Sequence, residues 1–289
     1  MFKNVLISLR PHFWVLSIIP ALVGAYIANG NLIDWQKFLL IAFMIGPCLS
    51  GIGELVNDYA DRKTDVLQHV KRIWKFPFSG GSGVVVVGGI NKQETITVTL
   101  LLASAAFLTA FYLNFREIAV VIGGLFVALE YSLEPLHAKS RGIAGPLLFA
   151  SGFRGLLSFH AGWLAFAPVS SLSLSISIFL ALLYFATFEL SHLADYNEDK
   201  LLKINTFPVQ AGFDLAKNIS GGFVGGSLVW LIIAYLENWL TLNILALPWL
   251  ILNQVFLAKY IALNNNRDAI MRLVPLALAV ICTAPLIFI

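Results

Sequence analysis

Residues 54–83 read ELVNDYADRKTDVLQHVKRIWKFPFSGGSG and mark the point where a long apolar run gives way to charged residues. On a helix, Asn57, Asp61 and Asp65 recur at every fourth residue, so each is rotated by only about 40° from the one before. The three side chains therefore share one stripe near the end of a hydrophobic segment. Close carboxylates repel one another unless a cation lies between them, and Mg²⁺ prefers hard oxygen ligands. The pattern predicts a magnesium site.

A second acidic pair, Asp195 and Asp199, ends another apolar run with the same spacing of four residues. An aspartate at a helix end is usually a solvated cap, and any one of these aspartates alone would fit that interpretation. Two such groups at matching positions favour metal binding. A faint repeat follows them, FPFSGG at residues 76–81 and FPVQAG at residues 207–212, and suggests a duplicated unit.

Composition indicates a membrane protein. Hydrophobic residues make up 58% of the chain and charged residues only 12%, whereas soluble domains have roughly 25% charged residues. Apolar runs of about 18–20 residues predict an all-α polytopic membrane protein in a single domain, residues 1–289. The net charge of +3 is too small to indicate a nucleic-acid partner. Cys48 and Cys282 both lie in apolar runs, which argues against a disulfide framework or a zinc site.

About nine transmembrane helices are expected, with bounds near residues 12–29, 38–58, 93–113, 117–133, 143–166, 172–195, 218–237, 241–262 and 271–288. The first run lacks a convincing cleavage site, so we expect a retained helix and not a signal peptide. Lysine and arginine gather in the loops that share a side with the N-terminus, which predicts a cytoplasmic N-terminus. Both acidic groups then lie at the cytoplasmic face of the cell membrane.

A divalent metal, two acidic groups and nearby cations at a membrane face suit a diphosphate ester with a lipid tail. Mg²⁺ neutralises a diphosphate leaving group, lysine and arginine add charge-assisted hydrogen bonds, and apolar helices keep water from the reacting carbon. A cation-coupled secondary transporter is the alternative from another class. It predicts ligands near the bilayer midplane, whereas these groups lie at its margin.

Three motifs resemble the UbiA superfamily of intramembrane prenyltransferases. NDYADRKTD at residues 57–65 is similar to the first aspartate motif of that family, and DYNED at residues 195–199, with TFPV at 206–209, is similar to the second. YSLEP at residues 131–135, followed by Arg141-Gly142, resembles the loop after the fourth span. The resemblance extends over most of the chain and implies Mg²⁺-dependent transfer of a polyprenyl group from its diphosphate.

The resemblance also implies roles for individual residues. The implied Mg²⁺ ligands are Asn57, Asp61, Asp65, Asp195 and Asp199, of which the four aspartates are the candidate catalytic residues. Lys139 and Arg141 would contact the diphosphate, and Tyr131 would lie near the reacting carbon. Lys203 stands near the position where the family often has Gly-Lys, and we expect it to substitute. His192 either orients a substrate or only forms hydrogen bonds within the bundle.

The acceptor is expected to be small and aromatic, a quinone precursor. FSGGSG at residues 78–83 resembles the loop of menaquinone-type dihydroxynaphthoate polyprenyltransferases, and its glycines could let backbone N–H groups approach an anion. The alternatives are a flexible loop, a non-aromatic lipid or sugar-phosphate acceptor, and a relative that has lost catalysis. Arg154 lies within a span and could either snorkel to the membrane surface or pair with a buried acid such as Glu130. No residue stands out as the base that removes the acceptor's proton.

Overall fold

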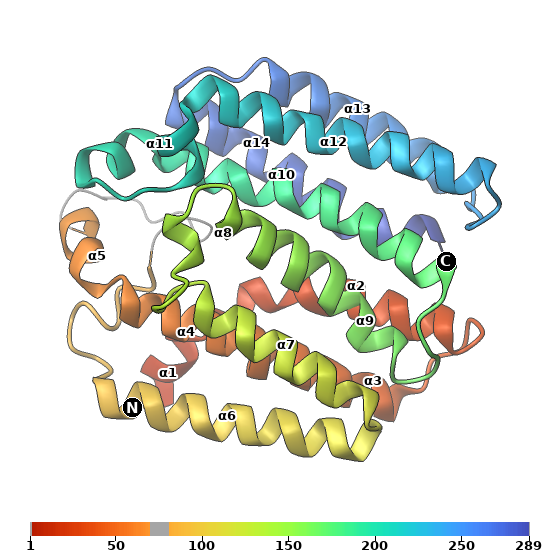
Figure 1. Ribbon diagram of the computed structural model, residues 1–289, viewed down its shortest axis with the longest axis horizontal. Helices are drawn as coiled ribbons and strands as arrows, with labels where there is room; N and C mark the ends of the chain where they lie inside the picture. Colours follow the sequence, from red (N-terminus) through yellow and green to blue (C-terminus); the bar gives the residue numbers. More distant parts are fainter. Residues whose placement is uncertain (1, 70–80, 289) are drawn as a thin grey trace.

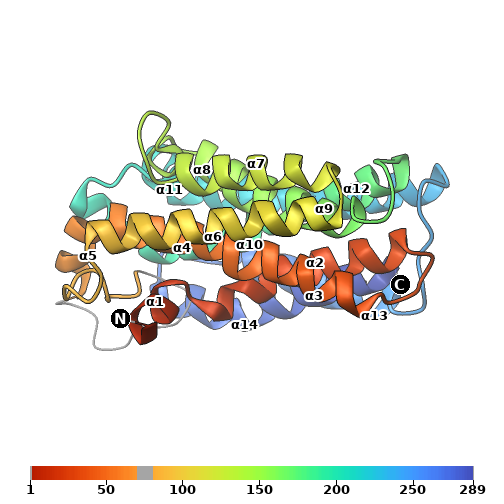
Figure 2. The same ribbon diagram turned by 90° about the horizontal axis from the view of Figure 1, so that it is seen from below.

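The structure is a computed structural model that describes residues 2–69 and 81–288, and within these ranges it is helical without a named β-strand. The long helices lie side by side in a bundle, with the connecting loops at its two ends (Figures 1 and 2). The first half of the chain contains α1 (Phe2–Ser8), α2 (Pro11–Ala28), α3 (Trp35–Phe43), a π-helical segment (Met44–Ser50), α4 (Gly51–Ala60), α5 (Arg62–His69), α6 (Lys92–Leu113) and α7 (Arg116–Glu130).

The second half continues the bundle from the loop that follows α7. It contains a 3₁₀ turn (Ala138–Ser140), α8 (Ala144–Pro146), a π-helical segment (Leu147–Leu157), α9 (Ser158–Trp163), α10 (Ser171–Leu202), α11 (Phe207–Ala211), α12 (Phe213–Leu236), α13 (Ala246–Ile261), α14 (Arg267–Thr283) and a final 3₁₀ segment (Ala284–Phe288). The all-α class expected from the sequence is therefore confirmed.

Six helical segments of the described chain are long and apolar enough to cross a membrane. They are Pro11–Ala28, Trp35–Ala60, Lys92–Leu113, Ser171–Leu202, Phe213–Leu236 and Arg267–Phe288. The other three predicted spans fall on α7, on residues 144–163 and on α13, which do not meet the same measure. The count of nine spans thus stays a prediction.

Helix α10 is the centre of the bundle and carries the second acidic pair at its C-terminal end. It packs against α12, α14 and the π-helical segment Leu147–Leu157. In Figure 1 it runs between α12 and α13 on one side and α9 and α7 on the other. Phe179, Leu183 and Phe185 along α10 are fully buried. The Phe185 ring stacks on that of Phe223 in α12, with ring centroids 3.9 Å apart. Apolar packing on several sides fixes the position and rotation of α10.

Two glycines let α2 and α9 approach each other closely. A Cβ atom at Gly24 would overlap the carbonyl oxygen of Phe159, and one at Gly162 would overlap that of Ala21. Because apolar side chains gain little by leaving lipid for protein, small residues that permit backbone contact are a main source of helix association in membranes. This contact holds α2 against α9, which lies near the middle of the chain.

We predict that Gly162→Ala lowers the free energy of unfolding by about 1–3 kcal/mol, because the added methyl group must displace a backbone. The matched control is Gly222→Ala in α12, where a Cβ would meet no atom within 4 Å. There, the substitution should be neutral or stabilise the helix by up to about 1 kcal/mol. Thermal unfolding of the two variants in detergent compares them, and equal stability would contradict the close packing of α2 on α9.

Candidate active site

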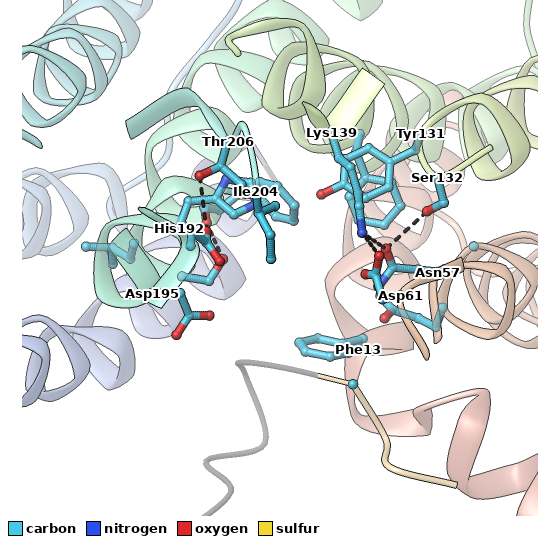
Figure 3. A pocket seen from close by; sticks show the side chains of 18 of the residues that line it. Phe13, Asn57, Asp61, Tyr131, Ser132, Lys139, His192, Asp195, Ile204 and Thr206 are labelled. Atoms are coloured by element: carbon cyan, nitrogen blue, oxygen red, sulfur yellow. Dashed lines mark hydrogen bonds and ion pairs between the residues drawn. The ribbon is translucent and has the colours of Figure 1, made fainter. Parts of the chain in front are cut away.

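A cavity of about 500 Å³ opens among the helix ends that carry the two acidic groups. Its lining includes all five predicted metal ligands, Asn57, Asp61, Asp65, Asp195 and Asp199. In Figure 3, Asn57 and Asp61 lie on one side of the open space and Asp195 lies on the other. The two groups, which are more than 120 residues apart in the sequence, therefore face a common volume, as the sequence predicted.

The first acidic group departs from the single helix that its spacing suggested. Helix α4 ends at Ala60, Asp61 caps it, and α5 begins at Arg62. Hydrogen bonds nevertheless continue across the break, because the Asp61 N–H donates to the Asn57 carbonyl (2.9 Å) and the Asp65 N–H donates to the Asp61 carbonyl (2.9 Å). The spacing of four residues is kept, so Asn57, Asp61 and Asp65 still line the cavity together.

The loop after α7 supplies polar partners to the first acidic group. The Lys139 ammonium forms an ion pair with Asp61 and donates to the side-chain oxygen of Asn57 (3.4 Å). The same oxygen accepts a hydrogen bond from the Ser132 hydroxyl (3.1 Å), and Figure 3 shows these contacts as dashed lines. Lys139 thus places a positive charge beside the first acidic group.

The second acidic group is held by the turn that ends α10. Lys203 adopts a left-handed conformation (φ 57°) and reverses the chain, which brings Thr206 back to donate to the Asp199 carboxylate (3.1 Å). Arg267 at the start of α14 forms an ion pair with Asp195 (3.3 Å). Both lysines that were predicted to contact the diphosphate, Lys139 and Lys203, line the cavity.

The two loops that border the cavity contact each other. Gly142 and Thr206 form a single parallel β-bridge, and the Asn205 side chain donates to the carbonyl of Ser140 (3.2 Å). Gly142 has φ +60°, and a Cβ there would overlap the side chain of Gln210. A glycine at this position therefore satisfies both the backbone conformation and the close packing of the loops. The cavity is bounded on this side by segments that belong to both halves of the chain.

The chemistry of the donor set indicates how Mg²⁺ would fit. Burial, followed by the carboxylates of Asp61 and Asp58, raises the pKa of Asp65 to about 7, and a nearby cation would relieve this repulsion. Among the described residues, no group of three or more His, Cys, Asp and Glu side chains could hold a metal ion by itself. Mg²⁺ is commonly held by one or two carboxylates together with substrate phosphates and water. The site therefore fits Mg²⁺ that is shared with a phosphorylated ligand.

Aromatic side chains form the wall of the cavity beside the acidic groups. Tyr131 packs on Phe149, with ring centroids 4.8 Å apart, and Phe149 packs on Phe188 at 5.4 Å. His192 continues this row, with its ring perpendicular to that of Phe188 (5.0 Å). Both predicted substrate-binding residues, Tyr131 and His192, line the cavity.

Arg141 does not reach the cavity, and this is the clearest difference from the expected site. Its exposed guanidinium donates to the carbonyl of Pro135 (2.8 Å) and to that of Leu136. Arg141 therefore ties its own loop together and is absent from the lining residues. In the predicted FSGGSG loop, residues 78–80 lie outside the described residues, and Gly81 lines the cavity next to the Asp65 carboxylate.

A buried ionic network adjoins the first acidic group, and sequence reasoning missed it. Its Arg10, Glu54 and Arg154 also line the cavity. Arg10 forms ion pairs with Glu54 (3.1 Å) and Asp58 (2.8 Å), and Arg154 forms one with the other oxygen of Glu54 (3.0 Å). The Asp58 carboxylate also accepts hydrogen bonds from the Ser82 N–H at 3.0 and 3.2 Å. Asp58 thus anchors the segment after residue 80.

The expected partner of Arg154 was wrong. Glu130 instead accepts a hydrogen bond from the backbone N–H of Leu136 (3.1 Å), and Glu54 neutralises Arg154. The helical rotation of about 100° per residue was a usable signal for part of the network, because it turns Asp58 away from the stripe of Asn57 and Asp61. Nothing in the local pattern pointed to Arg10, which looked like any other cation near the first apolar run.

Comparison with known proteins assigns this helical bundle to a class of membrane enzymes. Residues 17–279 match the UbiA prenyltransferase family. The chain belongs to this family. A solved UbiA homologue from Archaeoglobus fulgidus, bound to DMAPP and Mg²⁺, superposes with a TM-score of 0.74 over 96% of this chain and 99% of its own, at 19% sequence identity. At that identity the likeness shows the fold alone.

Two curated relatives share more of the sequence. The bacteriochlorophyll synthase 34 kDa chain of Chloroflexus aurantiacus is 30% identical over 71% of this chain, which spans 63% of that protein. A 4-hydroxybenzoate octaprenyltransferase of Nitrosomonas eutropha is 28% identical over 72% of this chain and 68% of its own length. The chain therefore spans less than two thirds of the bacteriochlorophyll synthase that it matches.

We predict that Glu54→Ala destabilises the protein by about 3–5 kcal/mol, the usual cost of removing one partner from a buried ion pair. Two buried arginines would lose the carboxylate that they share. The matched control is Glu237→Ala, because Glu237 is exposed at the end of α12. Thermal unfolding in detergent compares the two variants. Equal melting temperatures would contradict a structural role for the network.

Proposed function

We propose that this protein is an Mg²⁺-dependent intramembrane prenyltransferase that moves a prenyl group from its diphosphate to an acceptor. The observation that carries the proposal is the pair of acidic groups, from α4–α5 and from α10, which line one cavity at the ends of apolar helices. The family and the relatives named above support it. So does the homologue whose structure holds DMAPP and Mg²⁺.

In this proposal the five predicted ligands hold the diphosphate through Mg²⁺. Asn57, Asp61 and Asp65 act from one side, and Asp195 and Asp199 act from the other. When bound, Mg²⁺ would neutralise the diphosphate and make it a better leaving group. Lys139 and Lys203 add charge-assisted contacts to its oxygens. Thr206 keeps the Asp199 carboxylate oriented through its hydrogen bond.

The apolar part of the cavity suits the isoprenoid chain. Its lining includes Leu16 of α2 and Val274 and Leu278 of α14, which offer no group that could react with a developing cation. Their packing keeps water away from the reacting carbon. The ring of Tyr131 also lines the cavity, where an aromatic face can stabilise positive charge. Transfer then breaks the C–O bond of the donor, and the diphosphate leaves with the electron pair.

The acceptor forms the new bond to the freed carbon and gives up a proton. We propose an aromatic acceptor, supported by the 4-hydroxybenzoate octaprenyltransferases among the relatives. The second candidate acceptor is a larger ring system, because bacteriochlorophyll and chlorophyll synthases are also among the relatives. The charge distribution of the loops further supports one membrane domain with the N-terminus and the cavity on the cytoplasmic side.

The geometry disfavours the transporter alternative. A cation-coupled transporter is expected to bind its ions near the bilayer midplane at broken helices. Here Asp61 caps the end of α4, and Asp199 lies in the last turn of α10. An ammonium group beside the carboxylates also favours a phosphorylated ligand over a bare cation.

We predict that Asp61→Asn abolishes Mg²⁺-dependent prenyl transfer and leaves the protein folded in detergent. The loss should exceed the roughly 10–100-fold effect of removing an outer-shell partner of a metal ligand, because the ligand itself is lost. The assay uses geranylgeranyl diphosphate with a panel of hydroxybenzoate, dihydroxynaphthoate and chlorophyllide acceptors, and mass spectrometry of the products.

The matched control is Asp214→Asn, at a side chain that is 86% exposed in the first turn of α12. Its activity should equal that of the unmodified protein. Full activity of Asp61→Asn would contradict the proposed donor site. Uptake of a cation into liposomes, without any prenylated product, would favour the transporter.

A further inference from the structure

Glu189 and His192 form a buried acid–imidazole pair in the wall of the cavity. They lie one turn apart on α10, and Nδ1 of His192 is 2.8 Å from Oε1 of Glu189. Glu189 is fully buried, and its second oxygen has no hydrogen-bond partner in the described structure. His192 lines the cavity, one turn before Asp195. A buried carboxylate in an apolar bundle is costly, so this pair calls for an explanation.

The carboxylate determines what the imidazole can do. A carboxylate accepts hydrogen bonds, so Nδ1 of His192 carries the hydrogen and donates it to Glu189. The remaining ring nitrogen, Nε2, is then the one able to accept a proton. Packing against the Phe188 ring limits rotation of the imidazole. The arrangement is that of a histidine base with an orienting acid, and the cavity is where a substrate would meet it.

Prenyl transfer leaves a proton to be removed from the acceptor, and the carboxylates of the cavity are assigned to the donor in the proposed site. Asp61 is paired with Lys139, and Asp199 accepts from Thr206. Both carboxylates also belong to the proposed donor site. The ammonium groups of Lys139 and Lys203 carry protons already. Tyr131 is a phenol within an aromatic cluster, which leaves the imidazole as the best placed proton acceptor.

We propose that His192 accepts the acceptor's proton during prenyl transfer and that Glu189 is the positioning residue that holds its ring. This inference rests on the proposed prenyltransferase function. As the donor C–O bond breaks, the diphosphate leaves with the electron pair, and the acceptor forms a bond to the prenyl carbon. The acceptor's proton moves to Nε2 of His192, and its bonding electrons stay with the acceptor. The prenylated product, the diphosphate and a protonated imidazole remain, so atoms and charges balance.

The test separates donor chemistry from proton removal in the full-length protein. His192→Ala should lower the rate of acceptor prenylation by about 10²–10⁴-fold, the usual contribution of a positioned base. Mg²⁺-dependent binding of geranylgeranyl thiodiphosphate should stay within about 2-fold, since the donor site is intact. Added imidazole should restore part of the rate, because the truncated side chain leaves room for it. His12→Ala, at an exposed histidine on α2, is the control and should keep its rate with or without imidazole.

Further variants keep the test decisive if His192→Ala does not fold. His192→Gln retains an N–H donor for Glu189 and should fold, bind the donor and fail in transfer. Glu189→Gln retains an acceptor for Nδ1 and should lower kcat by less than His192→Gln, with the KM of the donor unchanged.

Three results would overturn the inference. The first is prenyl transfer by His192→Gln at a rate within a few-fold of the unmodified protein. The second is the absence of imidazole rescue in a folded His192→Ala. The third is that the His192 variants lose donor binding as well as transfer. Absence of transfer in the unmodified protein, with every acceptor tested, would instead overturn the proposed function itself and the inference with it.

Discussion

Burying charge among apolar helices is the physical constraint on which this structure depends. A charge in such surroundings is tolerated only beside an opposite charge or a hydrogen-bonding partner. Glu54 meets this requirement by lying between Arg10 and Arg154, and Asp58 does so through Arg10 and the Ser82 N–H. These pairs join the start of α2, the end of α4 and the Leu147–Leu157 segment. Glu54 also lines the cavity together with Asn57 and Asp61, so the neutralised pairs form part of its wall.

In the proposed mechanism, helix α10 packs the bundle, binds the donor and removes the acceptor's proton along a few turns, and its packing explains how. Its apolar length is fixed on several sides by α12, α14 and the Leu147–Leu157 segment, so its cavity-facing residues keep a constant order. Asp199 and Asp195 lie toward the loop end, and His192 follows one turn deeper. A donor gripped at the end of the helix would place its reacting carbon toward the imidazole. The proposal thus places diphosphate binding and removal of the acceptor's proton on successive turns of one helix.

Features that follow from the helical repeat could be predicted from the sequence. Side-chain pairs between residues far apart in the chain could not. The helical period, the apolar runs and the loop charges placed Asp61 and Asp199 at helix ends on one side of the membrane, and the family resemblance implied a shared ligand. The structure has both residues lining one cavity. The break at Asp61 was not visible, because the spacing of hydrogen bonds survives it. Arg141 is not among the cavity-lining residues, since the carbonyls of its own loop satisfy it. Arg10 and Asp58 are 48 residues apart, and no periodic pattern encodes such a pair.

The most direct test of the account is an experimental structure of this protein with Mg²⁺ and geranylgeranyl thiodiphosphate, a donor that resists cleavage. The account predicts density for the diphosphate in the cavity, with metal ions that bridge it to carboxylates of both α4–α5 and α10, and with the prenyl chain along α2 and α14. A ligand bound elsewhere, or metal held by only one of the two acidic groups, would contradict it.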